Sequence, residues 1–404
     1  MHTKLPGSRL FFLDWIRILA FFVLIFYHVG MYYVSDDWHV KSPHAGPAIE
    51  PLMLLSSPWR LGLLFMVSGV AASFMLGKSG TAGFLRKRSW RLLLPLLFGM
   101  FVVVPPQAYF EVVEKVAYAG SYAEFMGLYV TSYGGFCRAT DCLDMPTWNH
   151  LWFVAYLWVY TVVFAAIMQG AGTRFAAWSD TLAGWLTGWK ILALPTAMLA
   201  VLKLVLQPHF ETTHGLIDDW HNHAHSFSLF MLGALLARQP LFWARVDAIR
   251  WPALGIALSC WASMVVAFAW PEAGIERPLL EQVYNVQRVV YALCGWSAIV
   301  AACGFGHRHL NADSAARRYL TEAVFPVYIL HQTLIVSMAH LFKPAGLDPV
   351  TEAAALAVLT LCISFGTFEL VRRVSLLRPL FGLGPQAARA DASSGVPAVA
   401  VTAR

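Results

Sequence analysis

Apolar stretches of about 20 residues recur along most of this 404-residue sequence, and they constrain its fold more than any other feature. A helix of that length crosses a hydrocarbon core of ~30 Å and satisfies its own backbone hydrogen bonds in lipid. Since 58% of the residues are hydrophobic and only 13% are charged, the chain cannot cover itself with polar surface. We therefore predict an all-α, polytopic integral membrane bundle of about ten transmembrane helices. The expected spans are 10–33, 54–76, 90–110, 149–169, 183–206, 223–238, 251–270, 283–304, 319–341 and 351–371.

The basic residues are unevenly distributed between the loops on the two sides of such a bundle. The net charge of +6 is compatible with a nucleic-acid partner, but the cations do not form one patch. With the N-terminus inside, roughly 19 Lys and Arg residues fall on the cytoplasmic side and roughly 5 on the other, as the positive-inside rule requires. We therefore expect both termini in the cytoplasm, membrane lipid around the protein, and no nucleic acid.

One membrane domain is expected over residues 10–380. Residues 1–9 are expected to form a cytoplasmic N-terminal segment, and residues 381–404 a disordered cytoplasmic tail rich in Ala, Ser, Val and Gly. The first apolar segment is too long for a signal peptide and contains ionisable residues, so it is expected to stay in the protein.

Two of the six cysteines, Cys137 and Cys142, share a loop on the predicted outer side. An oxidising compartment permits a disulfide there, but a five-residue spacing does not establish one. The other four lie in apolar segments and are most simply packing residues.

The first predicted helix carries three ionisable residues, Asp14, Arg17 and His28. At ~100° and ~1.5 Å per residue, Arg17 and His28 lie about 20° apart around the axis and ~16 Å apart along it, so they share one face. Asp14 is one turn before Arg17 and can pair with it. His28 lies near the outer end, where a neutral imidazole can accept a proton. The alternative is a structural ion pair near the inner surface and an interfacial histidine.

The second predicted helix begins near Arg60, at a depth close to that of His28. A guanidinium there could hold an acidic substrate group or stabilise a developing oxyanion. The Ser68-Gly69 pair further along is better explained by close helix packing.

Four cations, Arg86, Lys87, Arg88 and Arg91, lie at the inner end of the third predicted span. Arg88 and Arg91 share a helix face, so the group is a candidate cradle for a phosphorylated ligand. The positive-inside rule alone also accounts for basic residues in this loop.

Further candidates to line a substrate site or pore are His150 and Trp152 at the outer end of the fourth span, and Tyr328 and His331 in the ninth. His150 lies in an aromatic belt at the outer surface, and for His331 a buried histidine bonded to a neighbouring helix is at least as good an explanation. The histidines between His209 and His225 do not have the spacing of a coordination site, so no metal is expected.

Taken in order, these motifs resemble membrane-bound acyltransferase family 3. The matching features are Arg17 with His28 eleven residues later, Arg88-x-x-Arg91, His150-Leu151-Trp152-Phe153 and Tyr328-Ile329-Leu330-His331. The segments 13–17 and 37–43 most resemble family members related to the glucan biosynthesis protein C group.

The resemblance implies transfer of an acyl group, acetyl or succinyl, from cytoplasmic acyl-CoA to a hydroxyl of a periplasmic or cell-envelope carbohydrate such as a glucan. It implies a bacterial inner (cytoplasmic) membrane protein without a bound cofactor, in which acyl-CoA is the donor substrate. His28 would be the general base, Arg17 and Arg60 would offset negative charge, Asp14 would orient Arg17, and Arg86, Arg88 and Arg91 would hold the CoA phosphates. Direct transfer and a covalent acyl-histidine intermediate both fit.

The main alternative is a polytopic transporter or exporter of an envelope precursor, which also needs charged groups among its helices. Such a protein would show internal repeats and paired broken helices, and we find neither in the sequence. A purely structural scaffold is disfavoured by the shared face of Asp14, Arg17 and His28.

Overall fold

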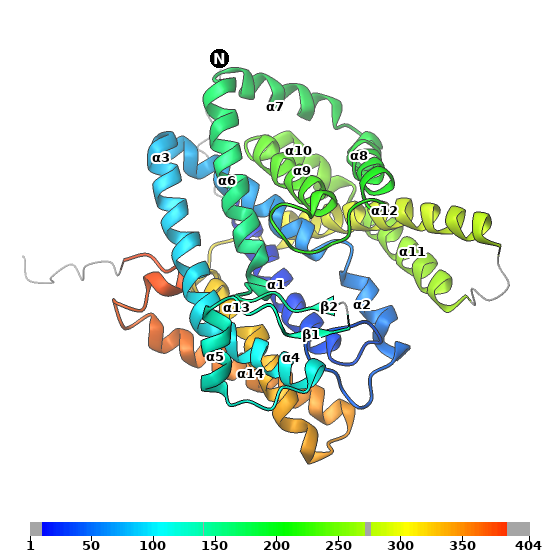
Figure 1. The fold of residues 1–404 in the computed structure, drawn as a ribbon. Coiled ribbons are helices and arrows are strands. Elements are labelled where there is room, and N and C mark those ends of the chain that lie inside the picture. The colour runs from blue at the N-terminus through cyan, green and yellow to red at the C-terminus, as the bar shows by residue number, and fades with distance from the viewer. Residues whose placement is uncertain (1–9, 140, 271–275, 386–404) are drawn as a thin grey trace, which may run out of the picture.

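Helix α1 (Phe11–Met31) lies inside the helix bundle, where it packs against α3, α12, α13 and α14 in the computed structural model (Figure 1). The structure describes residues 10–139, 141–270 and 276–385. Within these residues the fold is all-α apart from one short hairpin, which confirms the predicted fold class. The other long helices are α3 (Arg60–Phe98), α6 (Trp152–Ala171), α8 (Lys190–Leu206), α9 (Trp220–Leu236), α11 (Arg250–Ala269), α12 (Arg277–His309), α13 (Ala315–Phe342) and α14 (Pro349–Val371).

Shorter elements connect these helices. They are η1 (Pro47–Ile49), α2 (Glu50–Ser56), the π-helical η2 (Gly99–Val103), α4 (Pro105–Val116), α5 (Tyr122–Val130), β1 (Cys137–Arg138), β2 (Asp141–Cys142), η3 (Asn149–Leu151), α7 (Arg174–Trp185), α10 (Pro240–Ala248), η4 (Lys343–Ala345) and η5 (Pro379–Phe381).

Seven stretches of the described chain are long and apolar enough to cross a membrane, or nine if each of two bent helix pairs is one span. One of the seven runs from 47 to 103, which is long enough for two crossings, and its helix α3 is broken at Gly80. Gly80 has φ +63°, a left-handed conformation that ends regular helix and that glycine adopts without strain. The break separates the predicted spans 54–76 and 90–110, and counting both brings the upper total to the predicted ten. The exact count stays a prediction.

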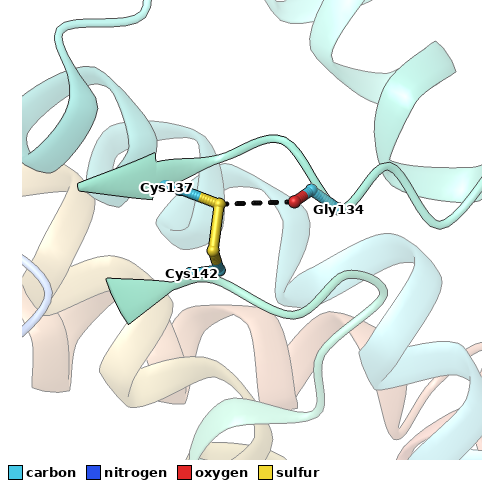
Figure 2. Close-up of a disulfide and its surroundings, with 3 residues drawn as sticks. All are labelled: Gly134, Cys137 and Cys142. Atoms are coloured by element: carbon cyan, nitrogen blue, oxygen red, sulfur yellow. Dashed lines mark hydrogen bonds between the residues drawn. A yellow bond between two sulfur atoms is a disulfide. The ribbon is translucent and has the colours of Figure 1, made fainter. Parts of the chain in front are cut away.

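The two ends of the bundle differ in what caps them. We call one the hairpin end, which carries α2, α4, α5 and the β1–β2 hairpin, and the other the basic end, which carries α7, α10 and the break in α3. Figure 1 shows α7 and the pair α4 and α5 at opposite ends of α6. At the hairpin end, β1 and β2 pair antiparallel, with Cys137 opposite Cys142, and these cysteines form a disulfide (Figure 2).

Helices α3 and α9 touch through two glycines. A Cβ atom on Gly69 would overlap the backbone of Phe230, and one on Gly233 would overlap the backbone of Met66. Small residues at both positions let the two backbones meet directly. The Ser68-Gly69 pair is therefore explained by close packing, as its sequence context suggested.

At the C-terminal side, Phe381 and Leu383 are buried, and Arg91 Nε donates to the carbonyl oxygen of Gly382 at 3.3 Å. The packed domain thus reaches slightly past residue 380. The predicted segment 1–9 and most of the predicted tail, residues 386–404, lie outside the described residues.

Candidate active site

A cavity of about 560 Å³ lies at the hairpin end, and we call it the histidine cavity. The last turn of α1 supplies His28, α3 begins at its wall with Arg60, and the loop after α1 adds His39. Other lining residues come from α1 and the loop after it, from η3 and the start of α6, from α13 and from the loop before α9. They include Tyr27, Asp37, Trp38, Trp148, His150, Trp152, Thr212, His214, Tyr328 and Gln332.

The protonation pattern of His28 follows from its neighbours in α1 and α13. His331 Nδ1 lies 2.6 Å from the carbonyl oxygen of Tyr328, so this nitrogen carries the hydrogen and donates it. His331 Nε2 is then an acceptor, and it lies 2.8 Å from His28 Nδ1. His28 must therefore donate from Nδ1, which leaves the lone pair on its Nε2. No other described residue hydrogen-bonds this nitrogen, so His28 is oriented as a base within the cavity.

His150 is held through both ring nitrogens and is nearly buried. Its Nε2 donates to the carbonyl oxygen of Ile329 at 3.1 Å, and its Nδ1 lies 3.4 Å from the amide nitrogen of Gln107. The Tyr328 hydroxyl donates to the His150 backbone carbonyl. This histidine joins η3 to α13 and α4, and it has no nitrogen left for proton transfer.

His39 is also occupied at both nitrogens. Its Nδ1 donates to Glu111 at 2.6 Å, and its Nε2 accepts from the side-chain amide of Gln332 at 2.8 Å. Burial would raise the pKa of Glu111, but the His39 ring and the Lys115 ammonium outweigh that effect and lower the pKa to about 2. The carboxylate therefore stays ionised and holds the loop after α1 to α4, while the contact between His39 and Gln332 holds the same loop to α13.

Arg60 is a buried guanidinium that lines the cavity and has no carboxylate partner among the described residues. It is 6% exposed and lies over the Tyr27 ring, with the guanidinium carbon 3.2 Å from the ring centroid. Its Nε and Nη1 have no hydrogen-bond partner in the described structure. Because a buried charge without compensation is costly, this cation is suited to an anionic group that arrives with a substrate or forms during reaction.

At the opposite end of α1, ionisable residues pair with one another. Arg17 Nη2 lies 3.5 Å from Asp14 Oδ1, the pairing that their spacing predicted. The other Asp14 oxygen pairs with Arg317, a 1% exposed residue of α13 that also contacts Asp313 at 2.7 Å. Asp14 therefore joins α1 to α13, a role that the sequence did not reveal, and neither Asp14 nor Arg17 lines the histidine cavity.

The paired arginines Arg88 and Arg91 lie at the basic end, in the second half of α3. Nε and Nη2 of Arg88 have no hydrogen-bond partner in the described part of the chain, and the positive charges of Arg91 and Arg17 act on its guanidinium. Arg86 is exposed. A group of positive charges that includes a partly buried arginine is suited to bind a phosphate.

The structure thus sorts the predicted site residues into two groups. His28, Arg60, His150, Trp152 and Tyr328 line one cavity, and His331 lies directly behind His28. Arg17, Asp14, Arg86, Arg88 and Arg91 lie at the basic end. Sequence reasoning missed His39 and Glu111, although charges at 111, 114 and 115, next to a predicted span, were an available signal.

Comparison with known proteins gives a match over almost all of the described chain. The profile of a family described as an acyltransferase domain matches residues 10–369. The chain is similar to glucans biosynthesis protein C of Salmonella typhimurium, with 22% identity over 401 residues, 96% of this chain and 98% of the relative. The Salmonella heidelberg protein of the same name is 22% identical over 397 residues, 95% of this chain and 97% of the relative. No solved structure matches the chain significantly.

Proposed function

This chain belongs to the acyltransferase family whose profile it matches, as its motifs predicted, and from that premise we propose which groups it transfers and how. Family membership and the apolar helices together make it a multi-pass membrane acyltransferase. We propose that the donor is cytoplasmic acyl-CoA, carrying an acetyl or succinyl group, and that the acceptor is a hydroxyl of an envelope carbohydrate. The relatives named for glucan biosynthesis support a carbohydrate acceptor. The proposed location is the bacterial inner membrane.

The chemistry centres on His28, whose Nε2 lone pair is left available by the hydrogen bond from Nδ1 to His331. Nε2 takes the proton of the acceptor hydroxyl while the hydroxyl oxygen attacks the thioester carbonyl. The tetrahedral intermediate then collapses, the carbon–sulfur bond breaks, and the His28 imidazolium returns the proton to the leaving thiolate. An acyl-histidine route would use the same lone pair as the nucleophile.

Arg60 is the group suited to stabilise the oxyanion of that tetrahedral intermediate. Its guanidinium lines the same cavity as His28, and two of its nitrogens have no hydrogen-bond partner among the described residues. A cation already desolvated in the ground state needs no reorganisation when negative charge develops. His331 acts as a positioning residue because its Nε2 accepts from His28 Nδ1 before and after proton transfer.

The donor would enter from the basic end. Arg88 and Arg91, with Arg86 nearby, would hold the CoA phosphates, and the long pantetheine arm would carry the thioester along the bundle. Arg17 and His28 are separated by ~16 Å along α1, so Arg17 is suited to guiding the donor and not to contacting the reacting carbonyl.

The observation that carries the proposal is that one cavity is lined both by His28, whose Nε2 has no hydrogen-bond partner among the described residues, and by Arg60, which has no carboxylate partner among them. It is tested with purified protein in proteoliposomes, with acetyl-CoA or succinyl-CoA as donor and an oligoglucan as acceptor. We expect transfer by the wild type and a loss of roughly 10³-fold in His28→Ala, as for removal of a general base.

The matched control is His44→Ala, which changes an exposed histidine of the neighbouring loop and should retain wild-type transfer. If His28→Ala folds normally and transfers at the wild-type rate, the assignment of His28 is wrong. If the wild type moves neither acyl group to the oligoglucan, the proposed donor and acceptor are wrong.

A further inference from the structure

A second cavity, of about 650 Å³, adjoins the histidine cavity, and we call it the lysine cavity. The two share part of their walls, namely Ser57, Leu61, Trp152, Thr212 and His214. The remaining walls come from α8, α9 and α12. A ligand in the lysine cavity therefore lies next to the space in which His28 acts.

The lysine cavity is positively charged. Lys203 of α8 and Arg288 of α12 line it, their charges act on each other, and its lining contains no Asp or Glu. Lys203 Nζ lies 4.2 Å from the centroid of the Tyr291 ring, and Arg288 Nη1 donates to Asn285 Oδ1 at 2.6 Å. Neither cation forms an ion pair with a carboxylate in the part of the chain that the structure describes. Two like charges near hydrocarbon without a counter-ion are unfavourable until an anion binds.

His221 of α9 supplies a second and independent sign of a missing ligand. This side chain is 7% exposed, lines the cavity, and has no hydrogen-bond partner for either ring nitrogen among the described residues. The side-chain oxygen of Gln207, also in the lining, is buried without a partner as well. Buried polar groups are nearly always hydrogen-bonded, and leaving one unpaired is unfavourable, so this set of groups is arranged for a polar ligand.

We propose that the lysine cavity is a subsite for an anionic group, a carboxylate or a phosphate, carried by one of the substrates of the transferase. Lys203 and Arg288 supply charge, and His221 supplies a ring N–H directed at the same group. The role of this subsite in acyl transfer rests on the proposed function. The binding of an anion in the lysine cavity does not.

Two substrates could carry that anion. It is either the far carboxylate of a dicarboxylic acyl group whose carbonyl reacts beside His28, or an acidic substituent on the acceptor carbohydrate. The chemistry recognised is the same, so variants of Lys203 and Arg288 are needed to separate the two sources.

Binding is measured first, without any transfer. Purified wild-type protein in detergent is titrated with succinate and, separately, with inorganic phosphate, and its unfolding temperature is followed. We expect at least one probe to give a saturable rise, and the concentration for half-saturation to increase at least tenfold in Lys203→Met and in Arg288→Gln. The control Lys190→Met, an exposed lysine of the same helix, should behave as the wild type.

The unfolding temperature without a probe excludes simple misfolding. Because each substitution removes one of two repelling charges, neither variant should unfold at a lower temperature than the wild type. The proposal is overturned if neither probe binds saturably to the wild type, or if both variants bind the probes as tightly as Lys190→Met does.

Transfer assays then assign the source. If the acyl group carries the anion, the ratio of kcat/KM for succinyl-CoA to that for acetyl-CoA falls at least tenfold in Lys203→Met. If the acceptor carries it, that ratio is retained and the KM for an acidic oligosaccharide rises at least tenfold. If the protein binds an anion but transfers no acyl group, the subsite is supported and the proposed function is wrong. If the protein transfers an acyl group but binds neither probe, the proposed subsite is wrong.

Discussion

The two ends of helix α1 use ionisable residues in opposite ways. At the basic end, Asp14 contacts Arg17 and the nearly inaccessible Arg317, which also contacts Asp313. At the hairpin end, His28 keeps one nitrogen open, and Arg60 has no carboxylate partner among the described residues. Both ends place ionisable groups where they are costly. The difference is that Asp14 has cationic partners within the protein, whereas Arg60, beside the other end of α1, has no carboxylate partner among the described residues.

This contrast predicts which charges are structural and which are functional. Removing one member of a compensated buried pair leaves the other stranded, so stability should fall. Removing an uncompensated buried charge relieves a cost, so stability should be retained or improved while chemistry is lost. Substitutions at the two ends can test this directly.

Arg317→Met is expected to have the largest effect, on stability. It removes the buried arginine that Asp14 and Asp313 share and leaves each carboxylate only an arginine that is more exposed, so we expect the unfolding temperature to fall clearly below that of the wild type. The measurement is the unfolding transition in detergent. Arg318→Met is the control, because Arg318 also contacts Asp313 but its side chain is 61% exposed, and exposed pairs contribute little. Equal effects of the two substitutions would contradict a structural role for Arg317.

Arg60→Met should instead lower kcat by 10²–10³-fold, roughly 3 kcal/mol of transition-state stabilisation, without lowering the unfolding temperature. Transfer kinetics and the unfolding transition are measured on the same preparations. Arg138→Met, which changes an exposed arginine of the hairpin, serves as the matched control. If Arg60→Met is less stable than the wild type but fully active, Arg60 is a structural charge and the contrast between the two ends is wrong.

The Arg88→Ala/Arg91→Ala double variant tests whether the basic end also contains an uncompensated, ligand-binding charge. CoA at about 100 times its Kd should stabilise the wild type by roughly 2.7 kcal/mol, and the double variant should lose this stabilisation. Arg174→Ala, an exposed arginine at the same end, should keep it. If saturating CoA does not stabilise the wild type, a transporter becomes the better explanation of these arginines.

The sequence predicted the helices well because apolar length is a local property. The apolar runs over 149–169 and 351–371 correspond closely to α6 and α14, whose bounds depend only on neighbouring residues. The run over 183–206 was less accurate, since α7 and α8 meet at a bend of 113° there. A turn of four residues hardly alters the average hydropathy of such a window.

The sequence named residues from several helices as site candidates, but it did not show which of them share one cavity. Helical geometry correctly related Asp14 to Arg17, which pair in the structure, but it did not show that only His28 of that face lines the histidine cavity. The His28–His331 contact joins residues 303 positions apart, and His39–Glu111 joins residues 72 apart. Periodicity within one segment contains no information about such tertiary partners, so the state of His28 and the role of Glu111 required the structure.

The glycine contact between α3 and α9 has a consequence for the size of the substrate. Arg60 begins α3 and His221 lies in the first turn of α9, so each helix of this pair supplies a polar group to one of the two neighbouring cavities. Gly69 and Gly233 bring the two backbones into direct contact, where no side chain can be repacked to change the spacing. Backbone geometry therefore determines the distance between Arg60 and His221, and under the two proposals it also determines the distance between the reacting carbon and the anionic group of the substrate.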